Sequence, residues 1–319
     1  MEPMIYRKLK NVNKEVSEIG IGLWSLVSNE WGIVSNSEKI LKYAYEKGIN
    51  FFDTADIYGK GKGEELLSIF KTNRDDIVIL TKVGYDLLTN KRRFDLDYLN
   101  KAINDSLNRL KTSYIDILML HNPTINVVTN EKIFEFLKDL KKEGKILSYG
   151  ISLGPTLGWK EEGLKAIEIG YESLEHIYNI IERYPGEDFL KYENIDHFIR
   201  VPHASDVLNE MKWPINYDSK LHRKFKDINW IKKGLQGAEI LKEKLKNYML
   251  YELALIFILS NRNVSSVLPN ITSITEIDKY IKINGLELKT DEKIIIEEIY
   301  NNYFKDLNQE SIEETQKYK

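Results

Sequence analysis

The sequence contains no cysteine, and this absence excludes disulfide bridges, cysteine nucleophiles and cysteine-based zinc or iron–sulfur sites. It also has no run of about 18 apolar residues, and residues 1–10 lack the apolar core of a signal peptide, so we expect neither a membrane span nor secretion. The 46 basic and 49 acidic residues nearly cancel to a formal net charge of −3, which provides no basic surface for nucleic acid. These absences predict a cytoplasmic protein that acts on a small molecule.

Proline and glycine are scarce as well, with 7 and 18 residues, and no stretch rich in either divides the chain into parts. Hydrophobic residues make up 42% of the chain, which is enough to form a large core. We therefore expect residues 1–319 to form a single domain, because α/β barrels commonly reach this length.

What the sequence does contain is a regular alternation of short apolar segments with longer segments of helical period, which is typical of a parallel sheet. Segments 77–80 and 117–120 are continuously apolar, as expected for strands covered on both faces. Eight such units favour a (β/α)8 TIM barrel over a doubly wound sheet. The expected strands are 17–24, 50–54, 76–82, 114–121, 146–152, 174–178, 197–202 and 264–269.

The two ends of the chain are expected to add further features to the barrel. Segments 6–9 and 15–16 flank a polar turn and predict an N-terminal β-hairpin at the barrel bottom. A C-terminal helix and tail follow the last strand, and the charged segment 308–319 is expected to be a solvated, frayed end. Ser35 and Glu38 have the spacing of a capping box and predict the start of a helix.

Four polar residues stand at or just beyond the carboxyl ends of three consecutive predicted strands: Asp53, Tyr58, Lys82 and His121. In a barrel these ends converge on one face, where active sites lie. Each residue alone has an ordinary structural explanation, such as a helix cap for the aspartate or a solvated side chain for the lysine. Together, an acid, a phenol, an ammonium and an imidazole form a set with catalytic potential.

This set suits the reduction of a carbonyl group. Hydride transfer leaves negative charge on the carbonyl oxygen, which then needs a proton donor and hydrogen-bond donors. Tyr58 can supply the proton, and the Lys82 ammonium is expected to shift the pKa of that phenol toward the working pH. Asp53 is expected to compensate the charge of the buried lysine, and a neutral His121 is expected to orient the carbonyl.

The residues around these four resemble a known family. Residues 53–59 (DTADIYG), Thr81 with Lys82, and Leu120 with His121 are similar in order and spacing to the Asp–Tyr–Lys–His tetrad of the aldo-keto reductases. The similarity continues along nearly the whole chain, in GIGLW (20–24), YGIS (149–152), IYN (177–179) and VLP (267–269). It implies a barrel enzyme that reduces an aldehyde or ketone to an alcohol with NAD(P)H, with Tyr58 as the general acid.

The resemblance also implies a nicotinamide nucleotide across the barrel mouth, NADP(H) with NAD(H) as the alternative. It assigns cofactor binding to Gly22, Trp24, Ser152, Glu175, Arg200, Pro202, Ser205, Asn270, Thr272, Ser273 and Glu276. Two positions depart from the family pattern, because Leu153 replaces a common asparagine and Glu175 replaces a glutamine that contacts the nicotinamide carboxamide. An ionised glutamate accepts hydrogen bonds from that group but cannot donate to it.

The adenosine end of the nucleotide is expected near the helix that begins after Thr272 and Ser273, where backbone N–H groups favour phosphate. Asn270 and Glu276 stand where members that prefer NADPH commonly carry Lys or Arg, so the resemblance implies little preference for NADPH over NADH. Ser273 and Glu276 also have capping-box spacing, and an ordinary helix start explains them equally well.

Other interpretations stay open at this point. Lys82 could form a Schiff base in a barrel lyase or aldolase. The departures at Leu153 and Glu175 are compatible with a regulatory protein that binds nucleotide but turns over slowly. Residues 59–63 (GKGKG) lack the spacing of a phosphate-binding loop and predict a turn, and the histidines show no HxH or HExxH spacing, so no metal site is expected.

The sequence contains no recognisable code for the carbonyl substrate or for the oligomeric state. Substrate specificity is expected to lie in loops after the strands and in the C-terminal tail, because such segments line barrel mouths. The two loops concerned are 86–94 and 204–230.

Overall fold

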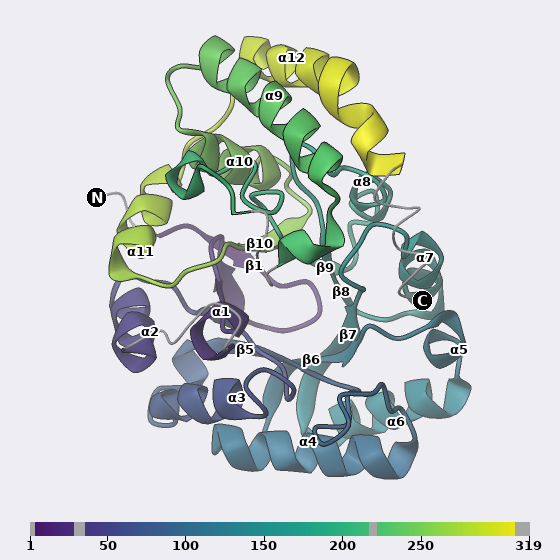
Figure 1. Cartoon of the computed structure of the whole chain (residues 1–319). Coiled ribbons are helices and arrows are strands. Elements are labelled where there is room, and N and C mark those ends of the chain that lie inside the picture. The colour runs from purple at the N-terminus through teal and green to yellow at the C-terminus, as the bar shows by residue number, and fades with distance from the viewer. Residues whose placement is uncertain (1–3, 29–35, 217–221, 310–319) are drawn as a thin grey trace.

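The computed structural model describes residues 4–28, 36–216 and 222–309. In these residues the barrel strands are β3 (Ile21–Gly22), β4 (Phe51–Asp53), β5 (Val78–Val83), β6 (Ile115–His121), β7 (Ile146–Ser152), β8 (Ser173–Ile177), β9 (Asp196–Arg200) and β10 (Val264–Leu268). The eight strands are parallel and pair in sequence order from β3 to β10 (Figure 1). A bridge between Ile19 and Val267 closes the ring. The predicted (β/α)8 barrel is confirmed.

Helices surround the barrel (Figure 1). Their bounds are α1 (Trp24–Val27), α2 (Ser37–Glu46), α3 (Lys62–Leu67), α4 (Leu96–Leu110), α5 (Ile125–Val128), α6 (Glu131–Lys142), α7 (Lys160–Ile169), α8 (Gly186–Phe189), α9 (Ile228–Lys244), α10 (Leu250–Leu259), α11 (Ile274–Tyr280) and α12 (Thr290–Ile299). Short 3-10 segments are Ser68–Phe70, Arg74–Asp76, Glu210–Lys212, His222–Phe225 and Ile281–Ile283, and a π-helical turn, Tyr300–Phe304, continues α12. None of the helices in the described ranges is long and apolar enough to cross a bilayer.

Local sequence determines where several of these helices begin and end. The side chain of Asp95 accepts a hydrogen bond from the backbone N–H of Tyr98 and begins α4. Asn130 begins α6 in the same way, with bonds from Lys132 and Ile133. After α6 the chain turns at Gly144, whose φ of +73° lies in the left-handed region that glycine adopts without strain.

The N-terminal hairpin consists of β1 (Tyr6–Lys8) and β2 (Glu15–Ser17), which pair antiparallel. Its apolar side chains close the bottom of the barrel. They are the side chains of Leu9, Val12 and Val16, and they pack against Phe51, Val78 and Phe198 inside the ring. The guanidinium of Arg7 donates hydrogen bonds to the carbonyls of Leu259, Asn261 and Val264, from the end of α10 to the start of β10. The predicted hairpin is therefore confirmed, and it ties the two ends of the barrel sequence together.

Side chains along each strand alternate between the barrel interior and the surrounding helices. Near the bottom the interior is apolar, and the rings of Phe51 and Phe198 stack there with centroids 4.8 Å apart. The same alternation continued toward the carboxyl ends places polar residues inside the barrel mouth. They are Asp53, Lys82, His121, Ser152, Glu175 and Arg200. The site thus lies above a closed apolar floor.

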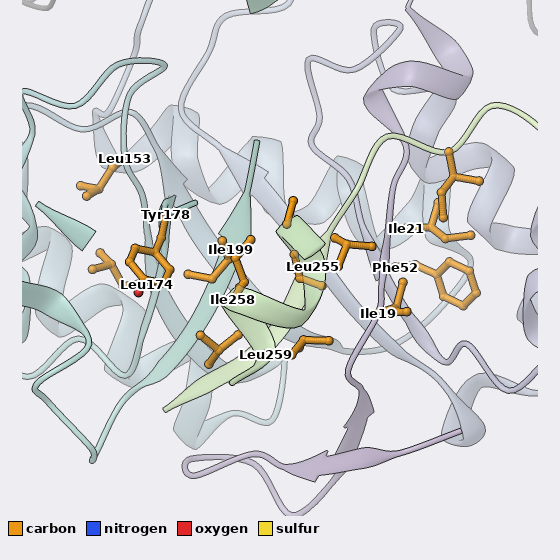
Figure 2. Close-up of a cluster of buried hydrophobic side chains, with 14 of the residues drawn as sticks. Ile19, Ile21, Phe52, Leu153, Leu174, Tyr178, Ile199, Leu255, Ile258 and Leu259 are labelled. Carbon is orange, nitrogen blue, oxygen red and sulfur yellow. The ribbon is translucent and has the colours of Figure 1, made fainter. Parts of the chain in front are cut away.

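The outward-facing side chains form a second, larger core between the sheet and the helices. Figure 2 shows part of it, with Ile199 of β9 and with Leu255, Ile258 and Leu259 of α10. Each fully buried aliphatic side chain of this kind stabilises the fold by roughly 1.5–3 kcal/mol. The outer core therefore holds the strand ends, and the polar groups on them, at fixed positions.

Some expectations about boundaries need correction. Strand β3 is shorter than predicted, because the chain already turns into α1 at Trp24. The tail does not begin at residue 308, since Asn308 is buried and its side chain bonds the backbone of Ile181, Arg183 and Tyr184. Residues 310–319 and Ser35 lie outside the described residues. The helix predicted after Ser35 is present as α2, preceded by Asn36.

Candidate active site

The four predicted catalytic residues meet at the barrel mouth. Lys82 is fully buried, and its ammonium forms an ion pair with Asp53 on the neighbouring strand β4. The same Nζ lies 3.1 Å from the carbonyl oxygen of Thr54 and 3.4 Å from the hydroxyl of Tyr58. The structure therefore brings the acid, the ammonium and the phenol into direct contact, as the sequence predicted.

Tyr58 lies in the turn that joins β4 to α3. Its backbone N–H donates to the carbonyl of Ala55, and its own carbonyl accepts from the N–H of Gly63. Gly59 and Gly61 have φ of +58° and +93°, so the tight turn uses backbone conformations that glycine favours. Of the predicted turn 59–63, residues 59–61 form the turn and α3 begins at Lys62, which leaves the Tyr58 hydroxyl 3.4 Å from Nζ of Lys82.

His121, the last residue of β6, stands beside Tyr58 with ring centroids 5.9 Å apart. Burial, together with the charges of Lys82 and Arg200, lowers the pKa of His121 well below its usual value. The imidazole is therefore neutral at neutral pH, as expected. Its buried Nδ1 has no hydrogen-bond partner among the described residues. A neutral ring of this kind can donate one hydrogen bond to a carbonyl oxygen.

Glu175 lies in the site, where it was predicted to bind the cofactor, but its contact with Lys82 was not predicted. Its carboxylate lies 3.1 Å from Nζ of Lys82 and 3.5 Å from Nε of Arg200. Lys82 therefore contacts two carboxylates, Asp53 and Glu175, where only Asp53 was expected. Arg200 also donates hydrogen bonds to the carbonyls of Leu153 and Gly154, which fixes its guanidinium at the edge of the site.

The electrostatics of Tyr58 differ from the expectation. Burial raises the pKa of the phenol above its usual value, Asp53 and Glu175 raise it further, and Lys82 and Arg200 oppose them. Lys82 acts with the expected sign, but the predicted net shift toward the working pH is wrong, because burial of the phenol disfavours the phenolate more than Lys82 and Arg200 favour it.

Lys82 itself stays charged. Burial alone lowers the pKa of the ammonium, but Asp53 and Glu175 raise it above its usual value. Burial raises the pKa of Asp53 to about 7, with Glu175 acting in the same direction and Lys82 against it. The set is thus a coupled cluster in which the ammonium is the most firmly protonated member.

A cavity of about 560 Å³ opens over these residues. Most of the residues predicted to bind cofactor line it, together with Asp53, Tyr58 and His121. They are Gly22, Trp24, Ser152, Glu175, Arg200, Pro202, Ser205 and Asn270. Lys82 does not line the cavity and acts from beneath Asp53 and Tyr58. Within the described ranges, no group of three or more acidic or histidine side chains is arranged to hold a metal ion.

Thr272, Ser273 and Glu276 do not line this cavity. One oxygen of Glu276 accepts hydrogen bonds from the backbone N–H of Thr272 at 2.8 Å and from the hydroxyls of Thr272 and Ser273 at 3.0 and 3.2 Å. Its other oxygen lies 2.8 Å from Nζ of Lys212. The donors expected for a phosphate thus bind an internal carboxylate, and Ser273 caps α11.

Several lining residues were missed by sequence reasoning. Tyr85 packs its ring edge against His121 with centroids 5.0 Å apart, and Asn122 donates to its hydroxyl. Trp159 adds a further aromatic wall. Arg92 and Phe225 also line the cavity, and they lie in the loops 86–94 and 204–230 that were predicted to do so. Asn122 could have been found, because it directly follows His121 at a strand end. Trp159 lies seven residues beyond the end of β7, where no local pattern marks it.

Comparisons with known proteins agree with this geometry. The sequence model of the Aldo/keto reductase family matches residues 18–301. A curated relative, the uncharacterized oxidoreductase YqkF from Bacillus subtilis, is 30% identical over 297 residues, which cover 90% of this chain and 94% of YqkF.

Two solved structures are similar along nearly the whole chain. The aldo-keto reductase AKR11C1 from Bacillus halodurans, in its holo form, has a TM-score of 0.76 and 28% identity, and the match covers 93% of this chain and 96% of that one. The glycerol dehydrogenase AKR11B4 from Gluconobacter oxydans has a TM-score of 0.78 at 22% identity, covering 93% and 95% of the two chains. The latter is a likeness of fold.

Proposed function

Because the chain belongs to the aldo/keto reductase family, we propose that it reduces an aldehyde or ketone to an alcohol with NADPH or NADH, and that Tyr58 is the general acid. The observation that carries the proposal is the contact of Tyr58 with Lys82, which is paired with Asp53, at the floor of a cavity that His121 also lines. We also infer that the protein acts in the cytoplasm on a small diffusible carbonyl compound, in keeping with its lack of cysteine.

The residues of the cavity fit a nicotinamide nucleotide. Ser152 and Asn270 provide side chains that can bond an amide or a ribose, and the cavity reaches from them to Tyr58. The buried Nε of Arg200 lies 3.5 Å from the Glu175 carboxylate and makes no hydrogen bond among the described residues, so this N–H can donate to a ligand group. When bound, the nucleotide supplies the hydride. Ser152, Arg200 and Asn270 would hold it.

The chain's own residues then bind and protonate the carbonyl oxygen of the substrate. His121 donates a hydrogen bond that orients the carbonyl, and the Tyr58 hydroxyl gives a proton to the oxygen as negative charge develops on it. A phenol of raised pKa is still a competent donor here, because an alkoxide is a much stronger base than a phenolate. Lys82 stabilises the phenolate that forms, and Asp53 keeps the ammonium in place.

The test is nucleotide binding by fluorescence, followed by a screen of aldehydes and ketones for nucleotide oxidation. We expect both nucleotides to quench and at least one aldehyde to be reduced by the wild type, with Tyr58→Phe binding nucleotide but reducing poorly. A wild type that binds no nucleotide, or that binds it without any turnover, would contradict the proposal. The second outcome would favour the regulatory interpretation instead.

The alternative in which Lys82 forms a Schiff base is disfavoured by its surroundings. A Schiff base requires a neutral amine, whereas two carboxylates hold the Lys82 ammonium charged. Borohydride trapping with a carbonyl substrate provides a direct check, and we expect no covalent adduct.

A further inference from the structure

Four charged side chains surround the phenol of Tyr58 inside the barrel mouth. Lys82 and Arg200 are the cations, and Asp53 and Glu175 are the anions. Asp53 pairs with Lys82, while Glu175 lies between the two cations, 3.1 Å from Lys82 and 3.5 Å from Arg200. Glu175 is buried, with 2% of its surface exposed, so solvent screens this charge little. With both carboxylates ionised the four charges cancel, and loss of the Glu175 charge leaves an excess of positive charge beside the phenol.

We propose that Glu175 is a positioning residue that keeps Tyr58 protonated, so that carbonyl reduction persists to higher pH and alcohol oxidation requires a more alkaline solution. The proposal rests on the function proposed above. It differs from the expectation that Glu175 serves chiefly as a partner of the nicotinamide carboxamide. The equilibrium between the reactants is unchanged, since an enzyme accelerates both directions, and only the pH dependence of the two rates moves.

The distances determine the size of the effect. The Glu175 carboxylate oxygen and the Tyr58 hydroxyl lie within 3.1 and 3.4 Å of the same nitrogen, Nζ of Lys82, so they are at most about 6.5 Å apart. At an effective dielectric constant of about 20, a unit charge about 6.5 Å away changes the pKa of its neighbour by roughly two units, and the Lys82 ammonium between the two groups reduces this. We therefore expect removal of the charge to lower the titration of Tyr58 by roughly one to two pH units.

The other groups near Tyr58 do not duplicate this effect. His121 is neutral at neutral pH because burial and the two cations lower its pKa. Asp56, two residues before Tyr58, is fully buried, and burial raises its pKa to about 8. It ionises within the titration range in every variant alike, so it does not account for a difference between them. Asp53 is likewise present in all of the proteins compared.

The experiment compares Glu175→Gln, Glu175→Asp and a matched control, Glu18→Gln. Glu18 is a buried glutamate that pairs with Arg7 at the opposite end of the barrel. The nucleotide-free proteins carry tyrosine labelled with ¹³C at Cζ, and Tyr58→Phe assigns the Tyr58 resonance. Each protein is titrated by NMR from about pH 6 to the highest pH at which it stays folded, and the onset of the Tyr58 chemical-shift change is compared, because burial raises the pKa of Tyr58 above the usual phenol range. The pH profiles of kcat/KM are measured for reduction and oxidation.

We expect the Tyr58 resonance and the alkaline limb of reduction to move one to two pH units lower in Glu175→Gln, and the rise of oxidation to move with them. In Glu175→Asp, which keeps the charge, the Tyr58 titration should stay within about half a pH unit of the wild type. In Glu18→Gln it should match the wild type. Coincident titrations of wild type and Glu175→Gln overturn the proposal. Because the NMR titration needs no turnover, it tests the role of Glu175 even if the protein reduces no carbonyl.

If Glu175→Gln does not fold, Arg200→Gln keeps the proposal open to refutation. Arg200 is one of the two cations that lower the pKa of Tyr58, so its loss should move the Tyr58 titration upward. A downward shift or no shift in Arg200→Gln would likewise overturn the proposed role of the charge balance.

Discussion

The choice between NADPH and NADH can be tested through Glu276, whose carboxylate occupies the donors expected for the adenosine phosphate. We predict that Glu276→Gln raises the ratio of kcat/KM for NADPH to that for NADH by ten- to a hundredfold. In the wild type the two nucleotides should differ by no more than roughly tenfold, which corresponds to ~1.4 kcal/mol. The reason is that the adenosine 2′-phosphate of NADPH must compete with the Glu276 carboxylate for the same donors.

The contacts of Glu276 give the magnitude. It accepts three hydrogen bonds from Thr272 and Ser273 and pairs with Lys212 at 2.8 Å. Burial alone raises the pKa of Glu276, but Lys212 and Thr272 lower it below its usual value, so the carboxylate is ionised at neutral pH. Two like charges about 5 Å apart, at an effective dielectric constant of about 20, repel by about 3 kcal/mol. Partial neutralisation by Lys212 reduces this to about 1.4–2.8 kcal/mol, hence ten- to a hundredfold.

The assay is the steady-state reduction of one good aldehyde with each nucleotide. Glu292→Gln is the matched control, because Glu292 is a buried glutamate that accepts from the backbone N–H of Lys289 at the start of α12, away from the cavity. Lys212→Ala should reduce the use of NADPH selectively if Lys212 turns to the phosphate. An unchanged nucleotide ratio in Glu276→Gln would refute the reasoning. A wild-type preference for NADPH beyond about a thousandfold, roughly 4 kcal/mol, would show that a cation already reaches the phosphate.

Three further predictions follow from the site and the core. Tyr58→Phe should lower carbonyl reduction by at least ~100-fold with nucleotide affinity nearly unchanged, because general acid catalysis contributes roughly 10²- to 10⁴-fold; a near-native kcat would remove Tyr58 from this role. Lys82→Met and Asp53→Asn should both impair turnover, the lysine change more severely, since it contacts the phenol directly; an unaltered pH profile in an active Lys82→Met variant would count against tuning by the ammonium. Burial lowers the pKa of His197 to about 4, so the unfolded state binds more protons between pH 6.5 and 4 and stability falls as the pH falls through that window. From pH 7 to 5 the loss from this one residue is about 2 kcal/mol. Urea unfolding of wild type and His197→Gln at both pH values should show it, and equal losses in the two proteins would contradict it.

Much of the fold and site could be predicted because both depend on local regularities. The period of two along the strands fixes which side chains enter the barrel, and the order of strands fixes which of them are neighbours. Asp53 and Lys82 lie on adjacent strands, so their pairing follows from strand order alone. His121 is the last residue of the next strand, β6, and its side chain also enters the barrel. Tyr58 follows from a short turn of known length.

The features that sequence reasoning missed depend on distances across the barrel. Glu175 on β8 meets Lys82 on β5 through the barrel interior, and no neighbouring-strand rule predicts that contact. The raised pKa of Tyr58 results from burial, which the chain acquires only when the ring closes. Trp159 reaches the cavity from a connection whose course depends on tertiary packing.

The closure of the ring between Ile19 and Val267 has a consequence during synthesis on the ribosome. Until β10 emerges, the segment around Ile19 and strand β9 both present unpaired backbone groups, and such edges recruit strands from other chains. Joining segments so far apart in sequence is also slow, because much chain entropy is lost before the contact forms. Arg7 finds its three carbonyl partners only after α10 has been made. A nascent chain that stops short of residue 264 is therefore expected to persist as an open, aggregation-prone sheet that depends on chaperones.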